Sequence, residues 1–266
     1  RTAAGPAPRF ATLPDMLQAQ AQALGETPAV RFAGKTYSYA KLARRSQRAA
    51  ARLAHQWGVG AGDRVAYLGW NHVDQLTLLF ALARLGAVFA PLNTRLAAPE
   101  WEGIARDCTP RMVVHDDAFA QAAHTLAARQ GLSAHHIDTL CATPVDGDAP
   151  QAAAGNAPVL LVYTSGTSGA PKGAVHTQHN LLANMAIAGE YTAQAATDLI
   201  ATVLPLFHVG GLCIQTLPAL YAGAQVILHP RFDAAAWLQC VAQDRPTTSL
   251  LVPAAMKAVV VVGAPS

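Results

Sequence analysis

The sequence is poor in cysteine, aromatic residues and charged residues. Among 266 residues there are four cysteines, 6% Phe, Trp or Tyr, and 13% charged residues. The cysteines are far apart and form no C-x-x-C pair: Cys108, Cys141, Cys213 and Cys240. This spacing favours neither a disulfide framework nor a zinc site, and we expect single buried thiols of a reducing compartment.

The small charge excess does not point to nucleic acid. The net charge is +3 with histidine neutral, and the one basic stripe lies at helical spacing: Lys41, Arg44, Arg45, Arg48 and Arg52. Apolar residues, among them Leu42 and Leu53, occupy the opposite side of the same segment. This pattern is typical of the solvated face of an amphipathic helix, so we predict no nucleic-acid partner.

A long uninterrupted apolar run is also missing. The most apolar stretch, Leu76 to Leu92, contains Arg84 and a glycine, and it is too short and too interrupted for a membrane span. The given residues show no apolar leader segment at their start. We therefore expect no transmembrane segment and a cytoplasmic location.

What the sequence does have is 52% hydrophobic residues, arranged in segments whose periodicity alternates between strand and helix. Residues 29–39 predict a hairpin around Ala33 and Gly34. Apolar strands such as "RVAYL", "VFAPL" and "VLLVYT" alternate with helical segments such as 39–57, 72–85, 99–107, 119–129, 180–191, 211–221 and 234–243. We expect an α/β fold with a largely parallel sheet and flanking helices, and we expect His135 and His136 in a solvated loop.

Residues 143–158 are rich in Pro, Gly, Ala and Asp and have no periodicity. They predict a surface connection between a first α/β lobe, residues 1–150, and a second lobe, residues 151–266. Near the end, "VPAAMKAVVVVGAPS" passes from a helix start directly into an all-valine strand with no turn. We expect that residues are missing from the sequence between Ala258 and Val259.

The segment "YTSGTSGAPKG", residues 163–173, contains features that a buried core does not need. Its glycines permit positive φ angles and a close approach of backbone N–H groups to a ligand. Its hydroxyl groups and Lys172 add neutral donors and one positive charge, a combination that suits a polyphosphate. The alternative, a simple surface turn, requires neither the lysine nor so many hydroxyls.

Two better-known motifs do not fit this segment. A Walker A motif needs Gly-Lys followed by Ser or Thr, whereas Lys172 follows Pro171 and precedes Gly173. A nucleophile elbow needs glycine on both outer sides of the serine, whereas position 170 is Ala. The serine- and glycine-rich loop of amidases is a weaker competitor.

The segment resembles the phosphate-binding signature of the adenylate-forming superfamily, which includes acyl- and aryl-CoA synthetases, peptide-synthetase adenylation domains and luciferases. Three further segments are similar to acyl-CoA synthetases in family order: residues 64–96, "LPLFHVGGL" at 204–212, and "VVVVGAPS" at 259–266. The resemblance implies a layered αβαβα N-terminal domain. It also implies that the family's C-terminal domain, with its adenylation lysine, is absent from these residues.

The resemblance implies an acid–CoA ligase. ATP, with Mg²⁺, would activate a fatty or aryl carboxylic acid to an acyl adenylate with release of pyrophosphate, and CoA would then take the acyl group as a thioester. The implied phosphate contacts are Thr164, Ser165, Gly166, Thr167, Ser168, Gly169 and Lys172. Of these, Lys172, Thr164 and Thr167 are the candidates for catalysis.

The resemblance also implies an acyl pocket and an adenine site. Phe207, His208, Gly210 and Gly211 would line the pocket, with His208 as a lining or gating residue and the glycines leaving room for an acyl chain. Next to adenine and the acyl group would lie Gly263, Ala264 and Pro265. We predict no protein metal site at His176 and His179, and no role is carried over to Gln178 or His179.

Two alternatives remain open at this point. The acyl adenylate is passed to a carrier-protein thiol instead of CoA, or the chain is a non-catalytic module that binds ATP or an adenylate. The particular acid is not readable from these residues. The sequence also leaves open whether the chain forms a homo-oligomer, and we expect the fragment alone to be inactive.

Overall fold

The structure is a computed structural model that describes residues 7–143, 147–150, 153–164 and 171–263. Its strands are β1 (Pro28–Phe32), β2 (Lys35–Ser38), β3 (Arg64–Leu68), β4 (Val88–Pro91), β5 (Met112–His115), β6 (Ser133–His136), β7 (Pro158–Thr164), β8 (Lys172–Thr177), β9 (Leu199–Thr202), β10 (Gln225–Leu228) and β11 (Thr248–Ser249). Its α-helices are α1 (Leu13–Leu24), α2 (Tyr39–Ala51), α3 (Val73–Leu85), α4 (Ala98–Cys108), α5 (Ala120–Gln130), α6 (Gln178–Thr192), α7 (Leu217–Ala222), α8 (Ala234–Asp244) and α9 (Pro253–Gly263).

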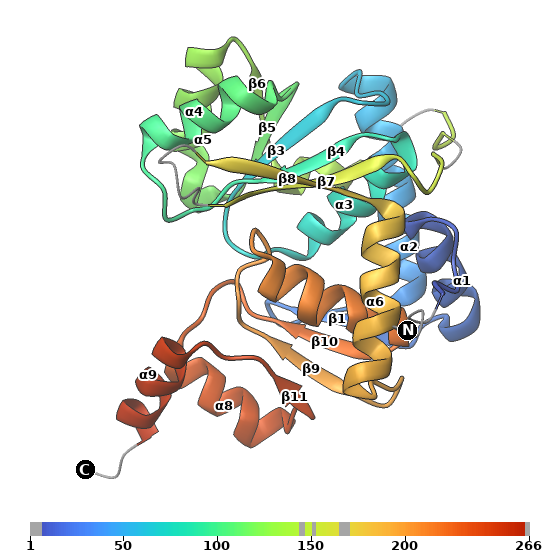
Figure 1. Cartoon of the computed structure of the whole chain (residues 1–266), viewed down its shortest axis with the longest axis vertical. Helices are drawn as coiled ribbons and strands as arrows, with labels where there is room; N and C mark the ends of the chain where they lie inside the picture. The colour runs from blue at the N-terminus through green and yellow to red at the C-terminus, as the bar shows by residue number, and fades with distance from the viewer. Residues whose placement is uncertain (1–6, 144–146, 151–152, 165–170, 264–266) are drawn as a thin grey trace, which may run out of the picture.

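The strands form two separate sheets (Figure 1). Sheet A has five strands in the order β11-β9-β10-β1-β2, and sheet B has six in the order β6-β5-β3-β4-β7-β8. All neighbouring strands are parallel except the β1–β2 and β7–β8 pairs, which are antiparallel hairpins. The predicted α/β fold with mostly parallel pairing and a hairpin at Ala33–Gly34 is confirmed.

Side chains alternate between two cores along the strands, which places helices on both faces of each sheet. In β3, Val65 and Tyr67 pack into the large central core, whereas Ala66 and Leu68 face a second core beneath α4 and α5. In β10, Val226 packs into the central core and Ile227 meets Cys240 of α8. With α3 between the sheets, the layers are helix, sheet, helix, sheet and helix (Figure 1), as expected.

Each sheet takes strands from both parts of the chain. Sheet A pairs β1 with β10, and sheet B pairs β4 with β7, so residues before 150 and after 151 share both sheets. The predicted division into lobes 1–150 and 151–266 therefore does not coincide with the division between the sheets.

The prediction of a valine strand near the C-terminal end is wrong. Helix α9 runs without a break from Pro253 through Ala258 and Val259 to Gly263. Its first half contains strong helix formers after a proline at the helix start, a position that proline favours. A strand would need a neighbouring strand to satisfy its backbone groups, whereas a helix satisfies them within itself. The valines consequently lie at the surface, with Val260 70% exposed.

The prediction that His135 and His136 lie in a solvated loop is also wrong. Both belong to β6, which pairs with β5 at the edge of sheet B. The ring of His135 stacks on Trp57 with 4.1 Å between ring centroids, and His136 Nε2 lies 3.0 Å from an Asp117 carboxylate oxygen. An edge strand this short and polar lacks the apolar alternation that identifies strands in a sequence.

Within the described ranges, no helix is long and apolar enough to cross a membrane.

Three partly or fully buried histidines make the stability of this fold depend on pH. Burial lowers the pKa values of His72, His115 and His229 below the ordinary value of 6.5. As the pH falls through 6.5, the unfolded chain binds protons that the folded chain does not yet bind. The free energy of unfolding should therefore fall by at most about 1.4 kcal/mol per pH unit for each such histidine. Urea unfolding midpoints at pH 7.5 and pH 5.5 measure this loss.

His72→Asn provides the matched control. The ring Nδ1 of His72 accepts a hydrogen bond from Asp74 N and so caps α3, a role that asparagine performs well. The variant should fold, and its unfolding midpoint should change less with pH than that of the wild type. An unchanged pH dependence would exclude His72 as a contributor.

Candidate functional site

The β7–β8 hairpin holds the two ends of the predicted phosphate-binding loop together. Thr164 is the last residue of β7 and lies opposite Lys172, the first residue of β8. The Thr164 hydroxyl is 3.5 Å from the carbonyl oxygen of Lys172, and both side chains are exposed. The hairpin thus carries an exposed threonine and an exposed lysine opposite each other at one end.

Several predicted site residues lie outside the described residues. In the loop these are Ser165, Gly166, Thr167, Ser168 and Gly169, and near the C-terminal end they are Ala264 and Pro265. Gly263 ends α9. The roles assigned to all of these residues stay predictions.

Tyr163 anchors this end of the hairpin to helix α4. Its hydroxyl donates a hydrogen bond to the carboxylate of Asp107. Burial, reinforced by this bond, raises the pKa of Tyr163, so that its hydroxyl remains a neutral donor. Gly173 lies directly opposite on β8, and a Cβ there would lie 2.8 Å from a Leu161 methyl and 3.2 Å from the Tyr163 ring.

The segment from Leu204 to Val209, which follows β9, carries the predicted pocket residues. Phe207 is buried, whereas His208 is exposed. The ring Nδ1 of His208 accepts a hydrogen bond from Gly210 N at 3.2 Å, so a neutral ring carries its proton on Nε2. The π-helix Gly210–Thr216 begins directly after this segment.

The hairpin end and the His208 segment meet at one cavity of about 460 Å³. Its lining includes Tyr163, Thr164 and Pro171 from the hairpin and His208 and Val209 from the segment after β9. The remaining wall comes from β7 and from the chain after β4: Val162, Asn93, Leu96, Pro99, Glu100, Gly103 and Ile104. The fold therefore brings Thr164 and His208 together, although they are distant in the sequence.

Phe207 faces a different cavity, of about 410 Å³. This second cavity is lined by residues that follow strands of both sheets, including Trp70, Asn71 and Arg95 after strands of sheet B. From sheet A come Leu204 and Arg231, whose guanidinium lies 5.7 Å from the Trp70 ring. Neighbouring residues, Phe207 and His208, thus line separate cavities.

Gly211 is required by the backbone that surrounds it. A Cβ at this position would lie 2.5 Å from the carbonyl oxygens of Leu204 and Pro205. At Gly210 the nearest atom would be a Leu204 methyl at 3.4 Å, an ordinary contact. The close approach at Gly211 therefore explains that glycine without a ligand, and the room it was expected to leave for an acyl chain stays a prediction.

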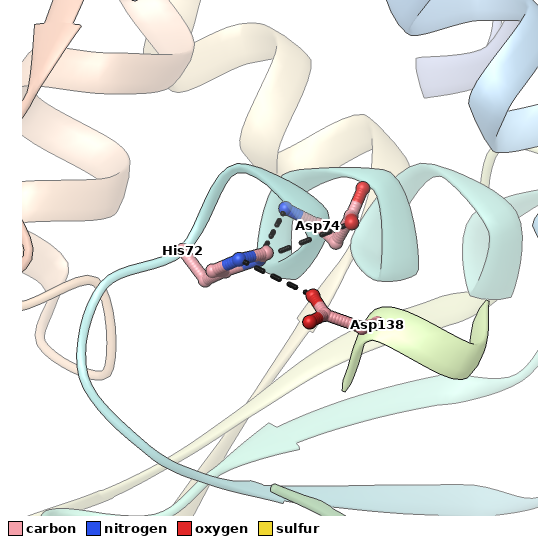
Figure 2. Close-up of side chains that lie close together, drawn as sticks. All are labelled: His72, Asp74 and Asp138. Atoms are coloured by element: carbon pink, nitrogen blue, oxygen red, sulfur yellow. Dashed lines mark hydrogen bonds and ion pairs between the residues drawn. The ribbon is translucent and has the colours of Figure 1, made fainter. Parts of the chain in front are cut away.

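A cluster of His72, Asp74 and Asp138 has the composition of a metal site (Figure 2). However, both carboxylate oxygens of Asp74 accept hydrogen bonds from Arg45, at 2.9 and 2.5 Å, and His72 Nδ1 accepts one from Asp74 N. The Nδ1 lone pair of His72 is thus already used, and the Arg45 guanidinium offsets the charge of the Asp74 carboxylate. We interpret the cluster as a structural network at the start of α3.

Sequence reasoning missed Tyr163, Asp107 and Asn71 as residues that position the site. A polar asparagine three residues after the apolar strand "VAYL" is the one signal that was available for Asn71. The Tyr163–Asp107 bond joins two distant segments and leaves no local pattern.

Comparison with known proteins shows the family to which the chain belongs. The family described as "AMP-binding enzyme" matches residues 17–266, and the chain belongs to this family. An indoleacetate–CoA ligase of Aromatoleum aromaticum is 44% identical over 242 residues, which are 86% of this chain and 47% of that protein. A feruloyl-CoA synthase of an Amycolatopsis species is 40% identical over 234 residues, 87% of this chain and 46% of that protein.

Solved structures of similar proteins have the same fold as this chain. The N-terminal domain of FACL13 from Mycobacterium tuberculosis matches with a TM-score of 0.84 and 26% identity, over 94% of this chain and 65% of that one. ATP-bound MatB from Rhodopseudomonas palustris matches with a TM-score of 0.81 and 26% identity, over 93% and 51%. The chain spans about half the length of the curated relatives it matches.

The two neighbouring glycines give a test of the local geometry. Gly211→Ala should destabilise the protein by about 1–3 kcal/mol, because its Cβ has no space beside the two carbonyl oxygens. Gly210→Ala should be nearly neutral or slightly stabilising. Urea unfolding of both variants measures the difference in stability. Equal stability would contradict the close approach of Gly211 to the two carbonyl oxygens.

Proposed function

We propose that the protein containing this chain is an acid–CoA ligase that activates a carboxylic acid with ATP and then forms a CoA thioester. The observation that carries the proposal is the hairpin end, where Thr164 and Lys172 lie side by side next to the cavity that His208 lines. Family membership over residues 17–266 and the names of the relatives support it.

The chemical problem is charge. A carboxylate must attack the α-phosphate of a polyanion, and negative charge then accumulates on the departing pyrophosphate. Lys172 at the hairpin end offers a positive charge and Thr164 a hydroxyl group, and both side chains are exposed to solvent. Such groups stabilise the transition state when they are positioned before the reaction, and we assign the same role to Thr167.

Mg²⁺ would supply further neutralisation of the phosphate charge. The carboxylate among the described lining residues of the cavity is Glu100, and it already accepts a hydrogen bond from Ala97 N. Phosphate oxygens and water are the usual ligands of Mg²⁺ beside a nucleotide. This part of the chain therefore fits an ion that is held mainly through the nucleotide.

The cavity beside the loop would hold the carboxyl end of the acid, with His208 at its mouth. Its walls are largely apolar, with Leu96, Ile104 and Val162 among them, which suits an apolar acid. Two relatives are named for aryl acids, and we therefore propose an aryl acid before a fatty acid. CoA is proposed as the acceptor in preference to a carrier-protein thiol for the same reason.

Lys172→Ala tests the phosphate role. In the full-length protein, acid-dependent exchange between ATP and pyrophosphate should fall roughly a hundredfold, the scale of losing one preorganised charge-stabilising group. Lys35→Ala, which removes an exposed lysine from β2 in the other sheet, is the matched control and should keep wild-type exchange. Equal exchange in both variants would remove Lys172 from the mechanism. ATP binding by the wild type without exchange for any acid would favour the non-catalytic module.

A panel of acids tests the substrate class. Exchange with indole-3-acetate and ferulate should exceed exchange with palmitate at equal concentration by about tenfold or more, a difference of about 1.4 kcal/mol in transition-state binding. A larger rate with palmitate would overturn the aryl assignment and leave the ligase reaction in place. Thioester formation is measured separately, by consumption of free CoA thiol.

A further inference from the structure

Asn71 joins the two sheets at the ends of their strands. It follows β3 of sheet B and is only 4% exposed. Its side-chain Nδ2 donates to the carbonyl oxygens of Leu204 and His229, both at 3.0 Å, and its Oδ1 accepts from Leu206 N at 2.7 Å. Its own backbone N donates to Pro230 O at 2.9 Å. Three polypeptide segments, after β3, β9 and β10, are thus fixed to one another by a single residue.

The segment that Asn71 holds forms the wall between the two cavities. Leu204 and Phe207 line the cavity of about 410 Å³, and His208 lines the cavity of about 460 Å³ next to Thr164. The same segment is also contacted by Gly211, which packs against the carbonyl groups of Leu204 and Pro205. Among the described residues, no other side chain bonds to the backbone groups of Leu204 and Leu206 that Asn71 holds.

We propose that Asn71 is a positioning residue that sets the place of His208 relative to Thr164, an inference that rests on the proposed function. An asparagine suits this task because one rigid side chain supplies the donor and the acceptor that neighbouring, oppositely directed backbone groups need. Buried bonds of this kind are costly to lose, since each unpaired backbone group is left without water. The segment therefore has one favoured position while Asn71 is present.

The competing explanation is that Asn71 contributes only to stability. Gln178 provides the comparison, because it is also a fully buried amide with hydrogen bonds to distant segments: Leu13 N at 2.9 Å and Ala83 O at 3.0 Å. Gln178 lines neither cavity. Gln178→Ala therefore removes a buried amide of the same kind without touching the wall.

The position of His208 is read directly by NMR of protein with ¹⁵N-labelled histidine, with the His208 signals assigned through His208→Gln. In Asn71→Asp the side chain keeps its size and its acceptor but loses both donors, and in Asn71→Ala all three bonds are lost. Both variants should shift the His208 ring signals, because the bond between Gly210 N and His208 Nδ1 is disturbed. Gln178→Ala should leave these signals in place.

The kinetic test uses acid-dependent ATP–pyrophosphate exchange in the full-length protein, below the melting temperature of every variant. Asn71→Asp should raise the KM for the acid by about tenfold, because its two lost hydrogen bonds loosen the segment that carries His208, with a smaller change in the KM for ATP. Gln178→Ala should keep the wild-type KM for the acid at a similar loss of stability.

The outcomes separate the two proposals. Unshifted His208 signals in both Asn71 variants, or an effect on KM no larger than in Gln178→Ala, would overturn the positioning role. If the wild type shows no exchange with any acid, the proposed ligase function fails, and the NMR result still decides whether Asn71 positions His208. Should Asn71→Ala fail to fold, Asn71→Asp, which keeps the volume and one bond, carries both measurements.

Discussion

The structure depends on burying helix α3 from all sides. Nearly every residue of this helix is inaccessible to solvent, including the polar side chains of Asp74, Gln75 and Thr77. A helix that is buried around nearly its whole circumference cannot lie on the surface of a single sheet. It requires a second sheet, and Figure 1 shows α3 between the two. The buried carboxylate of Asp74 is compatible with this position because Arg45 neutralises it.

The candidate site is a consequence of that arrangement. With both sheets facing one helical layer, loops that follow parallel strands of either sheet emerge near one another, the usual place for ligands in α/β folds. Thr164 arrives from sheet B and His208 from sheet A, and neither sheet could build the cavity alone. Tyr163, bonded to Asp107, fixes the hairpin that carries Thr164 and Lys172.

Local sequence patterns were sufficient to predict most helices and strands. They were insufficient to predict the contacts between these elements. The alternation in "RVAYL" identified β3 because both of its faces are covered by apolar layers. The valines at 259–262 misled, because their β-propensity has an effect only where a partner strand is available. Tyr163 with Asp107, and Asn71 with Leu204, are pairs of distant residues whose meeting is decided by topology. A single sequence without the fold contains no signal for such pairs.

The second cavity, of about 410 Å³, is built almost entirely from connecting segments. Apart from the first residues of α9, its lining lies in the connections after β3, β4, β9, β10 and β11, outside the strands and the central helices. A change of residue at Arg95 or Arg231 therefore alters the shape and charge of the cavity while the buried layers keep their packing. This separation allows the cavity to change while the scaffold stays the same.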